Sequence, residues 1–171
     1  MTSSVFLNGT VGVGKTTTSA ALGDLLTARQ VPHAVIDLDE TRRMWPSPAD
    51  DGFHFALSMR NLAALTENYR AAGAQRLVLA GVVESRDDVT AVERAIGGTI
   101  SVVRLVAPGD VVDARLRGRH VHDTDGLTWS LARRGELHAI LDAAGIEDHV
   151  VVSDGRPPAA LADEIATRLG W

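Results

Sequence analysis

A glycine-rich turn near the start of the chain has the residue types and the spacing that bind phosphate. Residues 9–16 read GTVGVGKT, which matches the pattern G-x-x-x-x-G-K-[ST] at every fixed position. Glycines let the backbone wrap closely around phosphate oxygens, so that successive N–H groups form a nest for an anion. The pattern predicts that the lysine reaches the β- and γ-phosphates and that the threonine hydroxyl binds a divalent cation. The residues expected to bind nucleotide here are Gly9, Thr10, Val11, Gly12, Val13, Gly14, Lys15, Thr16 and Thr17.

Lysine usage strengthens this interpretation. Of the 17 basic residues, Lys15 is the one lysine and all the others are arginines. A composition biased towards arginine explains the arginines but not the position of the single lysine. An ammonium is a compact point charge and a guanidinium is a planar fork, so the two are not interchangeable in a phosphate-binding turn. We predict that Lys15 is catalytic.

The same lysine count limits the kind of nucleotide-binding protein. A GTPase reads guanine with an Asn-Lys-x-Asp motif, which the sequence cannot contain because its one lysine lies in the turn. A motor-type ATPase would carry an apolar strand that ends in paired acids, whereas the third apolar run ends in Leu79, Ala80 and Gly81. Small-molecule and nucleotide kinases remain, and for these we expect ATP and Mg²⁺ as cofactors.

Two acids follow the second apolar run, at the edge where open α/β sheets bind ligands. Asp37 and Asp39 would lie on the same side of an extended chain, about 7 Å apart at Cα. We predict that Asp37 binds Mg²⁺ together with Thr16, that Asp39 takes the proton of an acceptor hydroxyl, and that both acids contact the substrate. Arg42 could hold an anionic group of that acceptor. The alternative is a solvated acidic turn that caps a short helix.

Arginines further along the chain are candidates for contacts with phosphate and base. Arg115 and Arg119 share one face of a predicted helix, so they could act in catalysis by neutralising charge on the transferring phosphoryl group. The alternative for this pair is a solvated basic helix end. Arg156 is expected to stack on the adenine of the nucleotide. Arg133 and Arg134 are expected to be solvated.

Several of these motifs resemble those of known kinase families. The spacing of Asp37, Asp39 and Arg42 is similar to the D-G-D-N-x-R stretch of adenylylsulfate kinases and, more loosely, to the D-x-D of shikimate kinases. Residues 84–86 look like a further segment of adenylylsulfate kinases, and residues 115–120 look like the lid of gluconate-kinase-like enzymes. Chloramphenicol phosphotransferase-like enzymes share the arrangement and fit about as well.

The resemblance implies an ATP-dependent phosphotransferase that moves the γ-phosphate to a hydroxyl of a small molecule. It also implies an acceptor site that includes Arg42, Arg60 and Arg86. Leu38 replaces the glycine of the adenylylsulfate kinase pattern and Glu40 replaces its asparagine, so the acceptor stays open. Two alternatives remain, a nucleoside or nucleotide kinase and a non-catalytic regulatory module that binds ATP.

The elements that must position these residues follow from the pattern of apolar residues. Five apolar runs alternate with segments of helical spacing, which predicts parallel βαβ units with helices on both faces of a sheet. We therefore expect an α/β fold of the three-layer P-loop NTPase type with a five-stranded, mainly parallel sheet and a short lid. Strands are predicted at residues 4–8, 33–37, 76–81, 99–106 and 150–153, and helices at 15–29, 53–72, 87–96, 110–118, 127–144 and 157–169.

Length and composition limit the architecture and the partners. The 171 residues suit a single kinase domain, 1–171, with a lid near 115–130 that we expect to become ordered when ligands bind. A net charge of −5 argues against nucleic acid as a partner, and no apolar run is long enough for a membrane span. The lack of cysteine excludes disulfides and thiolate metal sites. We expect a cytoplasmic protein whose partner is a small-molecule substrate, with a homodimer left open.

Overall fold

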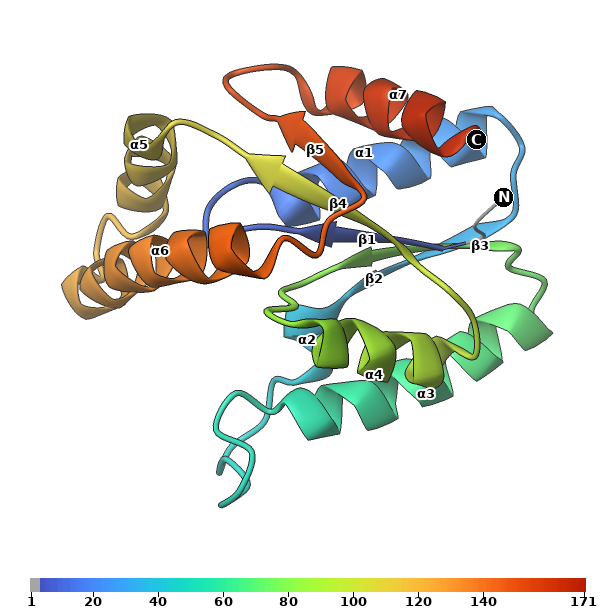
Figure 1. Cartoon of the computed structure of the whole chain (residues 1–171), viewed down its shortest axis with the longest axis horizontal. Coiled ribbons are helices and arrows are strands. Elements are labelled where there is room, and N and C mark those ends of the chain that lie inside the picture. Colours follow the sequence, from blue (N-terminus) through green and yellow to red (C-terminus); the bar gives the residue numbers. More distant parts are fainter. Residues whose placement is uncertain (1–3) are drawn as a thin grey trace.

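A five-stranded sheet runs through the middle of the molecule (Figure 1). The computed structural model describes residues 4–171. The strands are β1 Ser4–Asn8, β2 His33–Asp37, β3 Arg76–Ala80, β4 Ser101–Val106 and β5 His149–Val152. Their order is β2-β3-β1-β4-β5, and every neighbouring pair is parallel. The α/β fold predicted from alternating strands and helices is confirmed, and the sheet is wholly rather than mainly parallel.

Helices cover both faces of this sheet. They are α1 Lys15–Ala28, α2 Leu38–Thr41, α3 Phe55–Ala71, α4 Arg86–Ile96, α5 Gly109–Arg119, α6 Thr124–Ala144 and α7 Pro158–Leu169. α1 and α7 pack together on one face, and α3 and α4 pack together on the other (Figure 1). α5 and α6 extend beyond the carboxyl ends of the strands. No helix in the described part of the chain is long and apolar enough to cross a membrane.

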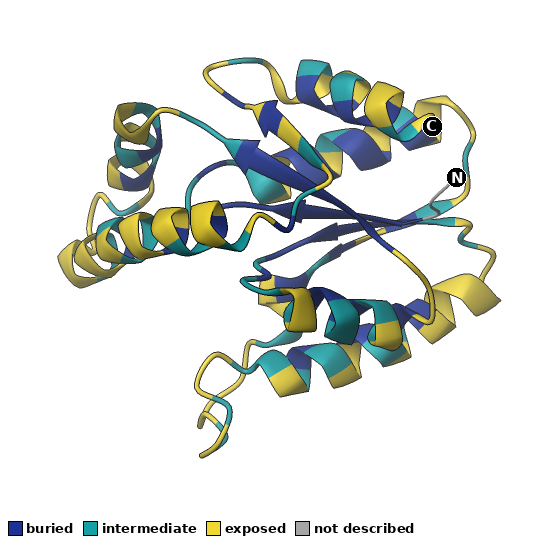
Figure 2. Ribbon diagram, viewed as in Figure 1, coloured by how far each residue is buried: buried dark blue, intermediate teal, exposed yellow. Residues whose placement is uncertain are grey.

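Two hydrophobic cores lie on opposite sides of the sheet. β1 shows the division most simply, because successive side chains of a strand point to opposite faces. Phe6 packs in the core that includes Leu62 of α3, whereas Leu7 packs in the core that includes Leu22 of α1 and Ile165 of α7. The inner strands β1, β3 and β4 and the inner faces of these helices are accordingly buried, whereas the edge strands β2 and β5 also carry exposed side chains (Figure 2). This double packing holds the strand ends, and so the loops that follow them, in fixed positions.

α2 is the short helix capped by an acidic turn that the sequence analysis gave as the alternative for these residues. It has four residues, which is too short for a periodic pattern to be visible. Its N-cap is Asp37, whose Oδ1 accepts a hydrogen bond from the Asp39 N–H at 2.9 Å. The extended arrangement predicted for these two acids is therefore wrong, because the strand ends at Asp37 and a helical turn begins directly after it.

A buried arginine ties the fourth strand to the end of α6. Arg104 of β4 is only 5% exposed, and it forms ion pairs with Asp142 and, at 3.3 Å, with Glu147. The hydrogen bond from Arg104 holds the pKa of Asp142 below its usual value. A buried charge is stable only when it is paired, so these contacts fix where α6 returns to the sheet.

We expect Arg104→Met to lower the free energy of unfolding by about 3 kcal/mol, because it leaves the carboxylate of Glu147 without its cation. Urea unfolding at neutral pH measures the loss. The matched control is Arg168→Met, which removes an exposed pair with Glu164 and should cost less than about 1 kcal/mol. Equal losses in the two variants would show that the buried pair stabilises no more than a surface pair does.

Candidate active site

The glycine-rich turn connects β1 to α1 at the carboxyl edge of the sheet. Gly9, Gly12 and Gly14 all have positive φ angles, which glycine adopts without strain. Gly9 is required for a second reason, since a Cβ atom there would lie 2.6 Å from the carbonyl oxygen of Leu105. The turn therefore packs directly against the end of β4, and α1 begins immediately after Gly14.

Lys15 folds back over the turn that precedes it. Its Nζ donates to the carbonyl oxygens of Gly9 and Thr10 at 2.9 and 3.0 Å. Burial lowers the pKa of Lys15 to about 8, and the nearby carboxylates of Asp39 and Asp37 act in the opposite direction. The amine is thus held beside the anion-binding turn. A phosphate bound there would raise the pKa of Lys15 again, because a nearby negative charge favours the ammonium.

Thr16 and Asp37 meet beside the turn, as predicted for a metal site. The Thr16 hydroxyl donates to Oδ2 of Asp37 at 2.7 Å, while Oδ1 of the same carboxylate caps α2. Hydroxyl and carboxylate oxygens suit Mg²⁺, which takes one or two protein ligands and completes its shell with phosphate and water oxygens. The pair therefore fits a nucleotide-bound Mg²⁺.

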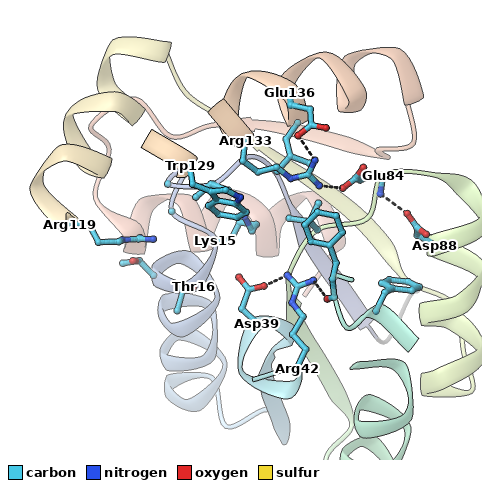
Figure 3. A pocket seen from close by; sticks show the side chains of 18 residues that line it. Lys15, Thr16, Asp39, Arg42, Glu84, Asp88, Arg119, Trp129, Arg133 and Glu136 are labelled. Atoms are coloured by element: carbon cyan, nitrogen blue, oxygen red, sulfur yellow. Dashed lines mark hydrogen bonds and ion pairs between the residues drawn. The ribbon is translucent and has the colours of Figure 1, made fainter. Parts of the chain in front are cut away.

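A cavity of about 650 Å³ opens beside the turn (Figure 3). Its walls come from the turn, from the α2 region, from the segment that leads into α3, from the loop after β3, and from α5 and α6. Asp37 does not line it, so the predicted contact of Asp37 with an acceptor is not formed here. Three aromatic side chains do line it, namely Phe53, Phe55 and Trp129.

Asp39 and Arg42 lie on one wall of this cavity, as predicted (Figure 3). Arg42 forms an ion pair with Asp39 and donates through Nη1 to the carbonyl oxygen of Phe53 at 3.4 Å. The carboxylate of Asp39 thus has a fixed neighbour and faces the same cavity as Lys15 and Thr16. A group that takes a proton from an acceptor hydroxyl beside the phosphates would have to lie in such a position.

A second cavity, of about 350 Å³, adjoins the turn towards β5 and α7. Arg156 lines it, and its Nη1 is held by Glu164 at 2.6 Å. Pro158 and Leu161 supply apolar surface beside that guanidinium. The predicted contact of Arg156 with adenine has a place in this cavity but stays a prediction. The residues that line both cavities are Gly12, Gly14, Thr17 and Arg119.

The two arginines predicted on a lid have different surroundings. Arg115 donates to the carbonyl oxygens of Val13 at 3.0 Å and Ser153 at 2.8 Å, so it joins the phosphate-binding turn to the loop after β5. Arg119 is exposed, lines both cavities, and has no ion-pair partner among residues 4–171. Arg119 thus fits the role of a cation available to a phosphoryl group, whereas Arg115 is a brace for the turn.

The structure does not bring Arg60 and Arg86 into either cavity, and this corrects the sequence-based prediction. Both side chains are exposed, Arg60 on α3 and Arg86 at the start of α4. The segment around Arg86 has a structural task, because Ser85 caps α4 and forms a capping box with Asp88. The residues 84–86 that resemble the adenylylsulfate kinase motif therefore lie where α4 begins, and Arg86 does not reach the cavity.

Arg133 of α6 also lies on the cavity wall, although the sequence analysis expected it to be solvated. Its side chain is 11% exposed and forms ion pairs with Glu84 and, at 2.7 Å, with Glu136. Its guanidinium also lies over the ring of Phe53, 4.9 Å from the centroid. Burial among these partners explains why the expectation of a solvated side chain was wrong.

Helical spacing could have identified Arg133. Trp129, Arg133 and Leu137 follow one another at intervals of four residues on α6, and all three line the cavity. Arg134, also expected to be solvated, forms an ion pair with Asp113 of α5. The face of α6 that carries Arg133 is thus turned to the cavity, whereas the next residue, Arg134, is turned to α5.

Asn8 is a positioning residue that the sequence analysis missed. It is buried at the end of β1, and its Nδ2 donates to the carbonyl oxygen of Val83 at 2.9 Å. Its Oδ1 accepts from the N–H groups of Gly9 at 2.9 Å and Val83 at 3.3 Å. Asn8 therefore joins the phosphate-binding turn to the loop that carries Glu84. An asparagine before a glycine is also typical of an ordinary turn, which is why its spacing gave no signal.

Comparison with known proteins bears on the fold. No family model and no curated protein matches the sequence. Among solved structures, the tunicamycin resistance protein of Deinococcus radiodurans is 21% identical with a TM-score of 0.70, and the match covers 99% of this chain and 96% of that one. A shikimate kinase from Bacteroides thetaiotaomicron is 18% identical with a TM-score of 0.68 over 100% of both chains. The APS kinase of Mycobacterium tuberculosis is 21% identical with a TM-score of 0.58 over 99% of this chain and 98% of that one.

These structural neighbours include kinases of the groups that the motifs resemble. Adenylylsulfate and shikimate kinases are among them, and so is a gluconokinase. At such identities the likeness concerns the fold, and in this respect the resemblance stated from the sequence is confirmed. The chain has the fold of the P-loop small-molecule kinases.

Proposed function

We propose that this protein is an ATP-dependent phosphotransferase that moves the γ-phosphate of ATP to a hydroxyl group of a small molecule. One observation carries the proposal: the phosphate-binding turn lies between two cavities, and Arg119 lines both. Phosphoryl transfer needs the leaving oxygen and the attacking oxygen on opposite sides of the transferred group. A donor in the smaller cavity and an acceptor in the larger one would meet at the turn.

The smaller cavity suits the nucleoside part of ATP. Arg156 and Leu161 offer a cationic plane and an apolar surface to the base. The N–H groups of the turn and Lys15 would hold the phosphates. Mg²⁺ held by Thr16 and Asp37 would neutralise charge on the β- and γ-phosphates.

The larger cavity suits the acceptor, and Asp39 is the group placed to accept the proton of its hydroxyl. One oxygen of the Asp39 carboxylate pairs with Arg42, which orients the carboxylate while the cavity stays open to it. Lys15 and Arg119 border the same cavity and would stabilise the negative charge on the phosphoryl group as it moves. An acid in this position favours catalysis over a regulatory module that only binds ATP, because a nucleotide-gated switch needs no base.

The acceptor itself is what distinguishes the members of this fold group. The neighbours named above comprise a shikimate kinase, an APS kinase and a gluconokinase, and their named substrates differ chemically. Mass spectrometry of reactions with ATP, Mg²⁺ and a panel of hydroxyl compounds tests the proposed function directly. A phosphorylated product that depends on the protein supports it. Nucleotide binding without any product, over a panel that includes nucleosides, sugars and hydroxylated antibiotics, would instead support the regulatory module.

The two acids should separate by role in the reaction so identified. Asp39→Asn should lower kcat by about 10²–10⁴-fold and leave the affinity for ATP nearly unchanged, because a base acts in the transition state. Asp37→Asn, the matched variant, should raise the Mg²⁺ concentration needed for half-maximal rate. Thermal unfolding of both variants serves as the control. If the two lose only stability and keep their kinetics, the carboxylates are structural caps.

The affinity for ATP should fall as the pH rises above 8, by up to about tenfold for each pH unit. The pKa of Lys15 is lowered by folding, so the free protein loses this proton at a pH at which the unfolded chain still keeps it. Bound phosphates favour the ammonium, and binding above pH 8 must therefore take up a proton. Calorimetric titration with a non-hydrolysable ATP analogue on either side of pH 8 measures the effect.

Lys15→Arg is the control for this pH dependence. A guanidinium keeps its charge over the whole range, so the variant should bind more weakly than the wild type but with a flat profile. A variant that showed the same decline as the wild type would exclude Lys15 as the titrating group.

A further inference from the structure

The arginines in the acceptor half of the larger cavity are already paired with carboxylates. Arg133 has Glu84 and Glu136 as partners on its two terminal nitrogens, and its exposed fraction is small. Arg42 has Asp39 as partner. Figure 3 shows both guanidinium groups turned to these acids within the cavity. An anionic acceptor would have to displace a carboxylate from one of them, and the displaced carboxylate would then lose its cation.

Negative charge predominates in this half of the cavity. Apart from Lys15 and Arg119 at the phosphates, its lining contains two arginines but four acids, which are Asp39, Glu84, Asp88 and Glu136. The carboxylate of Asp88 is fixed in place because its Oδ2 accepts from the N–H groups of Glu84 and Ser85 at 2.8 and 3.1 Å. A carboxylate, sulfate or phosphate on the acceptor would meet this surplus at short range.

Aromatic surface makes up much of the remaining wall. Phe53, Phe55 and Trp129 line the cavity, which is three of the seven aromatic residues in the sequence. Phe53 and Trp129 keep more than half of their surface exposed, although rings of this size are usually well buried. Rings that line an open cavity suit stacking against a flat or ring-shaped ligand.

We propose that the acceptor is an uncharged, ring-bearing alcohol, and that the carboxylates around Arg133 make the site reject anionic alcohols. This inference rests on the proposed function and names its class of substrate. The ring of the acceptor stacks between the aromatic side chains, and its hydroxyl reaches Asp39. Glu84 and Glu136 occupy Arg133, so that the guanidinium holds the walls of the cavity together instead of binding ligand. These two acids are specificity-determining residues.

The first test compares matched ligands in the presence of a non-hydrolysable ATP analogue. Calorimetry gives the affinity for methyl shikimate against shikimate, glucose against gluconate, and adenosine against adenylylsulfate. For the wild type we expect no measurable binding of the anionic member of each pair, or binding at least about tenfold weaker than that of the neutral member. Binding of any anionic member as tightly as its neutral partner would overturn the inference.

The second test removes the carboxylates that pair with Arg133. Glu136→Gln alone, and together with Glu84→Gln, should create binding of the anionic members, with the greater gain in the double variant. Glu40→Gln is the matched control, since Glu40 pairs with Arg43 outside the cavity and its loss should change nothing. Thermal unfolding shows whether each variant is folded, and the single variant at the more exposed Glu136 protects the test against misfolding of the double one. If neither folded variant gains affinity for any anion, the carboxylates do not set the specificity and the inference fails.

The outcomes separate this inference from the proposed function. A wild-type protein that neither binds the ATP analogue nor phosphorylates any compound would contradict the proposed function itself. A protein that binds the analogue and phosphorylates an anionic alcohol in preference to neutral ones would keep the proposed function and overturn only the choice of acceptor.

Discussion

The side chain of Asn8 fixes the phosphate-binding turn against the loop after β3, which carries Glu84. It is buried at the end of β1, and its amide makes three hydrogen bonds, one to the Gly9 N–H and two to the backbone of Val83. These two segments are far apart in the sequence and belong to neighbouring parallel strands, so sheet pairing alone aligns only the strands themselves. The amide extends that alignment into the loops. The position of Glu84, and through it that of Arg133, depends on this link.

The larger cavity has two regions that differ in the charge of the side chains that line them. Lys15 and Arg119 border the phosphate side, where a nucleotide would bring several negative charges. The opposite side holds acids and arginines in mutual ion pairs beside aromatic rings. The first region is incomplete without an anion, while the second already holds more carboxylates than guanidinium groups. A single cavity can therefore favour a highly charged donor and a neutral acceptor at the same time.

The sequence predicted the sheet and the phosphate-binding turn well because both depend on local patterns. Apolar runs identify buried strands, and the fixed glycines and Lys15 identify the turn without knowledge of the rest of the chain. On the acceptor side, Asp39 and Arg42 were placed correctly, but the residues beyond them were predicted poorly, since they come together only by tertiary packing. Arg60 and Arg86 were chosen by similarity of motif and lie outside, whereas Arg133 was expected to be solvated and lines the cavity. Its partner Glu84 lies 49 residues away, and no local pattern reveals such a pair.

Arg115 ties α5 to the phosphate-binding turn, whereas Arg119, on the same helix, is an exposed cation that lines both cavities. Arg115 donates at once to the phosphate-binding turn and to the loop after β5, so the first two turns of α5 cannot swing as a rigid body without losing both contacts. Arg119 lies one helical turn further on and carries no such tether. The residue that follows Arg119 is tied to the start of α6, because the ring nitrogens of His120 contact Asp123 and Ser130, each at 3.2 Å. Within α5, therefore, one guanidinium is held by two backbone carbonyls, while the other keeps its charge available at the edge of both cavities.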